Sequence, residues 1–164
     1  MINEKRTVII KDVELFYTKL SQPVNPFGTE QWETQIRTTD KGAADGWKKD
    51  FFLNVKENKE EGFWFANLTR GLYRKDKGVV TEQKNTPPDV VDGQRQPMDP
   101  TTIGYGSKGA VRIFQAPYKF GGRQGVSTTL SAVQVTDLVP YAKSTSVDFD
   151  VVGQVKSGEA QADF

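Results

Sequence analysis

Apolar and polar residues alternate or cluster in ways that predict strands along the first half of the chain. Residues 8–17 are rich in β-branched and aromatic side chains, which indicates a long first strand. Residues 32–38 alternate Trp, Thr and Ile with Glu, Gln and Arg37, the pattern of a half-buried strand. Residues 63–70 predict a third strand, with Phe63 and Phe65 on one side and Trp64 on the other.

The segment between the second and third predicted strands has a different spacing. Trp47, Phe51, Phe52 and Val55 stand at positions i, i+4, i+5 and i+8, with lysines and glutamates between them. One apolar stripe of this kind predicts an amphipathic helix within residues 46–61, ended by Gly62.

The second half of the chain begins with a polar stretch. Residues 73–103 contain four prolines and predict a long loop that is functional or mobile. Residues 110–120 predict a strand in which Pro117 marks an edge or a bulge, and residues 126–139 predict the last strand. About five strands with one inserted helix favour a mainly β fold, a small Greek-key barrel such as the OB-fold. A β-sandwich is the alternative.

The composition excludes several kinds of chemistry. The chain has no cysteine and no histidine, so disulfides, Cys/His zinc sites, thiol nucleophiles and histidine bases are all excluded. Its 21 acidic residues are spread along the sequence, so we expect no catalytic role, no metal and no cofactor. No apolar run approaches the roughly 20 residues of a membrane helix, and no signal region follows the first charges. We therefore expect a cytoplasmic protein with no membrane partner.

Charge divides the chain into two parts. Residues 144–164 hold four acidic residues and one lysine, a net charge of −3, which leaves +4 on residues 1–143 because the whole chain carries +1. We predict an OB-fold-like domain over residues 1–143 and a disordered acidic tail over 144–164. In the tail, Glu159 and Asp163 precede Phe164, and an aromatic ring beside a carboxylate can anchor in an apolar pocket rimmed by cations.

Basic and aromatic residues interleave in the predicted domain, a mixture that single-stranded nucleic acids require. Base faces stack on aromatic rings while cations follow the phosphates. The alternative is that the rings fill the core. The candidate DNA-binding residues are Arg37, Lys48, Lys49, Trp64, Arg70, Tyr73, Arg74, Tyr105, Lys108, Arg112, Phe114, Tyr118, Lys119 and Arg123.

Residues 104–111 match the pattern G-x-G-x-x-G-x-V. A dinucleotide site would open a helix at this point, but the residues that follow are strand-like. A kinase would need a histidine in its catalytic loop, and the chain has none. We therefore interpret the motif as a glycine-rich turn between strands, in which Lys108 could meet a phosphate.

Two parts of the chain together resemble the single-stranded DNA-binding proteins of bacteriophages. One is the acidic tail that ends in phenylalanine; the other is the succession Pro88-Asp89-Val90-Val91-Asp92, Ile103-Gly104-Tyr105-Gly106-Ser107 and Leu130-Ser131-Ala132-Val133-Gln134-Val135. The resemblance implies an OB-fold that coats single-stranded DNA, without sequence specificity, in phage replication, recombination and repair inside the host cytoplasm. It also implies that the tail recruits the phage DNA polymerase and helicase–primase and competes with DNA, often from a homodimer. A structural β-sandwich protein of the phage and a carboxylate-metal nuclease are the alternative functions.

Overall fold

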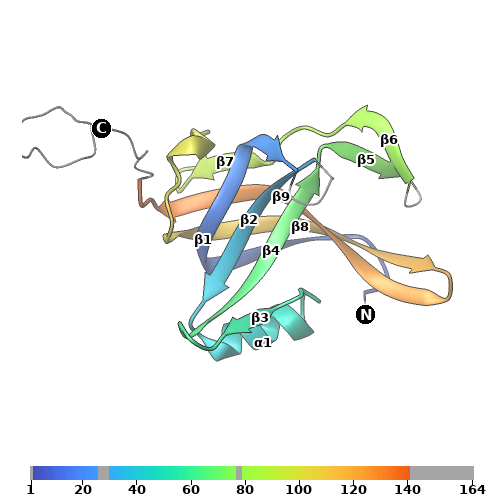
Figure 1. The fold of residues 1–164 in the computed structure, drawn as a ribbon, viewed down its shortest axis with the longest axis horizontal. Helices are drawn as coiled ribbons and strands as arrows, with labels where there is room; N and C mark the ends of the chain where they lie inside the picture. The colour runs from blue at the N-terminus through green and yellow to red at the C-terminus, as the bar shows by residue number, and fades with distance from the viewer. Residues whose placement is uncertain (1, 26–29, 77–78, 141–164) are drawn as a thin grey trace, which may run out of the picture.

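A computed structural model describes residues 2–25, 30–76 and 79–140 of the chain (Figure 1). The described residues form nine strands, one α-helix and one short 3-10 helix. In chain order these are β1 (Arg6–Val24), β2 (Gln31–Thr38), α1 (Lys41–Lys49), β3 (Lys56–Asn58), β4 (Phe63–Gly71), β5 (Tyr73–Asp76), β6 (Val79–Lys84), β7 (Asp89–Asp92), η1 (Pro100–Thr102), β8 (Ser107–Phe120) and β9 (Arg123–Asp137). The predicted tail, with Glu159, Asp163 and Phe164, lies outside the described residues.

Seven of the strands form one sheet in the order β3-β4-β2-β1-β8-β9-β7, and β5 and β6 form a separate hairpin. The long strand β1 belongs to both halves of the sheet. Its first half pairs with β8 and its second half with β2, and the register shifts between Ile10 and Val13. The sheet curls round until β4 contacts β9, so the strands enclose a barrel (Figure 1). This confirms the mainly β, OB-fold-like architecture.

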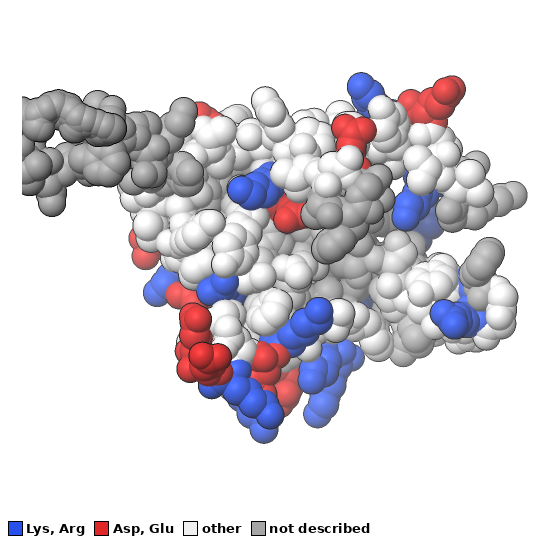
Figure 2. Space-filling view, viewed as in Figure 1, with Lys and Arg blue, Asp and Glu red and all other residues white. Residues whose placement is uncertain are grey.

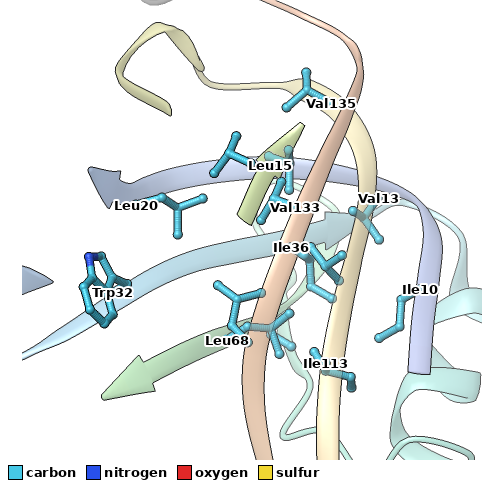
Figure 3. Packing of buried hydrophobic residues seen from close by; sticks show 14 of the residues in the cluster. Ile10, Val13, Leu15, Leu20, Trp32, Ile36, Leu68, Ile113, Val133 and Val135 are labelled. Carbon is cyan, nitrogen blue, oxygen red and sulfur yellow. The ribbon is translucent and has the colours of Figure 1, made fainter. Parts of the chain in front are cut away.

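The core lies inside this barrel and is built from alternate residues of its strands. In β2 every second residue is buried, from Trp32 through Ile36 to Thr38, as the sequence predicted. Leu15, Ile36 and Ile113 are completely buried and converge with residues of β4 and β9 (Figure 3). Because alternate side chains point inward, the intervening residues of β1, β2 and β4 face outward and are free to form a binding surface.

The predicted helix over residues 46–61 is wrong in its position. Helix α1 begins after Asp40, whose side-chain oxygen accepts a hydrogen bond of 3.0 Å from the Gly42 N–H, and it ends at Lys49. Phe52 then takes a φ of 52°, which no helix continues through. Phe51 and Val55 still pack against the core, but from an irregular segment. The apolar spacing of residues 47–55 therefore reflects side chains that pack against the core, and it does not reflect a helix.

The predicted loop over residues 73–103 is also wrong, because it contains β5, β6, β7 and η1. The hairpin of β5 and β6 projects from the barrel, so its strands lack a buried face and show no apolar alternation (Figure 1). The expected position of Pro117 at an edge is confirmed. It pairs with Val126 of β9, but β1 pairs with β8 only as far as Gln115, so the other side of Pro117 has no neighbouring strand.

Within the described part of the chain, no helix is both long enough and apolar enough to span a membrane.

Candidate nucleic-acid interface

A groove of about 690 Å³ opens on the outer surface of the barrel where β4 meets β9. Its walls come from the connection between β1 and β2, the end of β4, the β5–β6 hairpin and the base of the β8–β9 hairpin. Both hairpins project on this side of the molecule (Figure 1). The groove is therefore a surface feature shaped by two arms and open to a long ligand.

Cationic and aromatic side chains line this groove together. Arg70, Tyr73, Arg74 and Phe114, all predicted from the sequence, contribute to its wall, as does Lys75. The carboxylate of Glu30 also borders it, so the positive charge is partly offset at one end. The combination supplies ring faces for stacking and cations for phosphates within one cavity.

Arg70 is held in place at the edge of the groove. Its Nε donates a hydrogen bond of 2.8 Å to the carbonyl oxygen of Thr86. Partial burial lowers the pKa of the Arg70 guanidinium from its ordinary value, and the nearby negative charge of Asp89 opposes that shift. An arginine remains protonated under such a perturbation, so Arg70 presents a fixed positive charge.

Phe114 reaches the groove because successive side chains of β8 point alternately into the core and outward. Ile113 and Gln115 point into the core and are completely buried, whereas Phe114 points outward and is 40% exposed. It stands opposite Thr129 of β9, which also lines the groove. A half-exposed ring on a strand paired on both sides is a rigid stacking platform.

The β8–β9 arm carries a second exposed ring. Tyr118 lies opposite Gly125, and a Cβ placed on Gly125 would stand 2.4 Å from the Tyr118 hydroxyl oxygen. The glycine therefore lets the ring lie flat across the neighbouring strand while half of its surface stays exposed. Lys119 and Arg123 are exposed nearby on the same arm.

Arg37 occupies the centre of a second group, here called the aromatic–arginine cluster, at the other end of the β2–β4 face. Its guanidinium carbon lies 3.7 Å from the ring centroid of Phe16 and 4.2 Å from that of Phe63. Both distances fall within the range of cation–π attraction. The cluster consists of Phe16, Tyr17, Arg37, Phe63, Phe65 and Tyr105.

A break in the alternation of β1 makes this cluster possible. The register with β2 shifts between Phe16 and Lys19, and Tyr17 takes a φ of 50°, which few non-glycine residues adopt. Phe16 and Tyr17 consequently both contact Tyr105, although they are consecutive. Tyr105 is carried by the glycine-rich turn, in which the Gly106 N–H donates to the Leu15 carbonyl oxygen at 3.0 Å. The motif is thus a turn that leads into β8, as predicted.

Four more of the predicted residues, Lys48, Lys49, Trp64 and Arg112, belong to neither group. Lys48 and Lys49 are exposed at the end of α1. Charges of both signs gather over α1 and β3 (Figure 2). Trp64 alternates with Phe63 and Phe65 along β4, is half-buried, and does not pack against the core cluster. Arg112 forms an ion pair of 3.5 Å with Asp89 on β7.

Lys108 stands beside a hollow of about 410 Å³ that Arg37 also borders. Three carboxylates, those of Asp12, Glu14 and Asp137, line the same hollow. Across residues 2–25, 30–76 and 79–140, no group of three or more acidic side chains is arranged to hold a metal ion.

Sequence reasoning did not select Phe16, Tyr17, Phe63, Phe65 or Lys75 as binding residues. Phe63 and Phe65 share a side of β4, where their ring centroids lie 5.9 Å apart, and the alternation of residues 63–65 could have identified them. No local signal marks Phe16 and Tyr17, because their joint exposure depends on the bulge in β1.

No protein-family model matches the sequence, and no curated protein does. The arrangement of strands nevertheless defines a class: a single OB-fold-like barrel with projecting hairpins. Solved structures of bacteriophage proteins share it. The single-stranded DNA-binding protein of bacteriophage Enc34 superimposes with a TM-score of 0.55 and 16% identity, over 88% of this chain and 87% of that one. The single-stranded DNA-binding protein gp2.5 of bacteriophage T7 gives 0.53 and 16%, over 93% of this chain and 100% of that one.

The Enc34 protein has also been solved in complex with single-stranded DNA, and that structure matches with a TM-score of 0.53 and 15% identity, over 83% and 89% of the two chains. At these identities the likeness shows the fold. The fold that the sequence resemblance implied is therefore confirmed.

Proposed function

We propose that this protein binds single-stranded DNA in the groove between the β5–β6 and β8–β9 hairpins. The observation that carries the proposal is the gathering of Arg70, Tyr73, Arg74, Lys75 and Phe114 around one open groove. Rings can stack on any base and the cations meet phosphates, so binding should be independent of sequence.

The position of the groove supports the same conclusion. OB-folds bind oligonucleotides on the face of their second and third strands, between the loop that joins the first two strands and the loop that joins the last two. In this protein β2 and β4 form that face, the connection after β1 borders the groove, and the β8–β9 hairpin overhangs it. The structural neighbours named for single-stranded DNA binding add independent support.

Fluorescence anisotropy with labelled single- and double-stranded oligonucleotides tests the proposal. We expect tighter binding of the single strand. Three cations line the groove, and at about −0.7 per phosphate neutralised they predict a log–log salt slope of roughly −2. Arg74→Gln should weaken binding, whereas Arg95→Gln, in the exposed turn after β7, is a matched control that lines no part of the groove.

Two results would contradict this function. Equal affinity for duplex and single strand would remove the preference that the rings are proposed to create. Cleavage of the oligonucleotide in magnesium would indicate a nuclease, whereas we propose a binding protein without catalytic activity.

We further propose that the protein coats single strands during phage DNA replication, recombination and repair in the host cytoplasm. For residues 144–164 we propose recruitment of the phage DNA polymerase and helicase–primase, with Glu159, Asp163 and Phe164 as the contact, and competition with DNA. A homodimer belongs to the same proposal. These roles rest on the sequence of the tail and its resemblance to phage proteins.

Deleting residues 144–164 should raise DNA affinity, most at low salt. Phe164→Ala should weaken polymerase binding in a pull-down and leave DNA affinity unchanged.

A further inference from the structure

We propose that the aromatic–arginine cluster is a second contact point for the same DNA strand, so that the strand runs along β2 from the groove to Arg37. This inference rests on the proposed function, because it assigns the cluster the same ligand as the groove. It goes beyond that function by adding a separate binding surface and a direction for the strand.

The groove and the cluster lie at opposite ends of one sheet face. Gln31 lines the groove and Arg37 forms the cluster, and both belong to the outward-facing set of β2. They are six residues apart, which corresponds to about 20 Å along a strand. The two ends of β2 lie beside the projecting hairpins and beside α1, respectively (Figure 1).

Polar amides connect the two ends. Gln35 Nε2 donates a hydrogen bond of 3.1 Å to Asn67 Oδ1, and Arg37 Nε donates one of 2.6 Å to Gln35 Oε1. Glu33 lies in the same row, where Gln31 Nε2 donates to its carboxylate at 3.2 Å and Lys19 pairs opposite it. The path is therefore polar, with one negative charge that a neighbouring lysine partly offsets.

The cluster has the properties of a ligand site. Among the described residues the one ion pair joins Arg112 to Asp89, so Arg37 forms no ion pair there, although Glu14 stands opposite it on β1. Tyr17 and Tyr105 are 43% and 57% exposed and offer free ring surface. The positive φ of Tyr17 is a strained conformation, and such strain concentrates at binding sites.

The surface beyond the cluster limits the path. Asp12, Glu14 and Asp137 line the adjoining hollow together with Arg37 and Lys108, so three acidic against two basic residues leave its lining with a net charge of −1, which disfavours phosphates. A strand that enters at the groove should therefore end near Arg37. The prediction is a site of defined length that short oligonucleotides fill only in part.

The test measures affinity for thymidine oligonucleotides of about 4 to 16 nucleotides, the range of OB-fold site sizes. Tyr105→Ala and Arg37→Gln should each weaken binding of the longest oligonucleotides by about 5- to 150-fold and leave the shortest unchanged. Glu33→Gln removes the negative charge on the path and should strengthen binding of long oligonucleotides. Arg95→Gln is the charge-matched control and should change neither. An oligonucleotide carrying 5-iododeoxyuridine at one end should cross-link to Tyr105.

The inference and the proposed function fail in different ways. If Tyr105→Ala and Arg37→Gln bind long oligonucleotides like the unmodified protein while Arg74→Gln does not, the cluster is no contact and the groove still is. If the cluster variants melt at a lower temperature and bind short and long oligonucleotides equally more weakly, the cluster serves only to hold β1, β2 and β4 together. That result would also overturn the inference. If the unmodified protein binds no single strand, both proposals fail.

Discussion

Phe114 offers the sharpest test of the groove, because two substitutions separate its stacking surface from its packing. The ring projects from β8 into the groove wall and is 40% exposed. Phe114→Leu keeps an apolar side chain against the neighbouring strands but removes the flat face on which a base would stack. Phe114→Tyr keeps that face and adds only a hydroxyl that the open groove can accommodate.

The structure sets the scale of each effect. About six-tenths of the side chain is buried, roughly 90–150 Å² for an aromatic residue, so complete truncation would cost at most about 2–4 kcal/mol of folding free energy. Leucine retains most of this burial, and the loss of stability should stay below about 1.5 kcal/mol. Loss of one base–aromatic stack should cost about 1–3 kcal/mol of binding free energy. Phe114→Leu should therefore weaken DNA binding more than it weakens the fold.

Thermal melting and anisotropy on the same preparations measure the two quantities. We expect Phe114→Leu to melt close to the unmodified protein and to bind single strands about 5- to 150-fold more weakly. Phe114→Tyr should match the unmodified protein in both. Unchanged affinity of a folded Phe114→Leu variant would refute the argument that this ring stacks on a base.

Three other predictions concern the β8–β9 hairpin, the start of β8 and acid stability. Tyr118→Ala should lower DNA affinity by about 1–3 kcal/mol with little effect on melting, because the ring is half exposed. A folded Tyr118→Ala variant with unchanged affinity would contradict this. Gly109→Ala should destabilise the fold at the upper end of the about 1–3 kcal/mol typical of overpacking, because its Cβ would stand 1.9 Å from the Gln134 carbonyl oxygen, and an unaltered denaturant midpoint would contradict this. Hydrogen bonds from the backbone N–H and the hydroxyl of Thr101 lower the pKa of Asp99, so its contribution to stability is complete above the unfolded-state pKa of about 3.9 and is lost as the pH falls through the lowered folded-state pKa. Asp99→Asn should weaken this acid dependence in melting curves between about pH 2 and 7, and identical pH profiles would show that the carboxylate contributes nothing.

The elements that the sequence predicted well are those whose pattern is local. Every second residue of β2 is buried because the strand has a core on one side and solvent on the other. The same period predicted that Phe63 and Phe65 share one side of β4, where their rings are neighbours. In a strand that packs on the core with one face, apolar and polar residues alternate along the sequence, so the sequence shows which residues belong to each face.

Local patterns failed where burial and secondary structure do not coincide. The aromatic spacing of residues 47–55 comes from a segment that leaves its helix at Lys49 and continues to pack against the core. The helix itself begins after Asp40, a capping residue whose signal is short and lies before the apolar stripe. The β5–β6 hairpin has no core contact to impose alternation, so its polar sequence resembles a loop.

The sequence by itself determined a mainly β domain whose basic and aromatic residue types suit single-stranded DNA. Only the tertiary structure decided which of those residues meet. Arg70, Tyr73, Arg74 and Phe114 converge because β4 closes against β9 and two hairpins project beside that seam. Arg37 gains its aromatic neighbours because a bulge turns two consecutive residues of β1 toward the same ring. The groove and the aromatic–arginine cluster each bring together residues that are far apart in the chain. The pattern of neighbouring residues does not predict where a barrel closes or where a strand shifts its register.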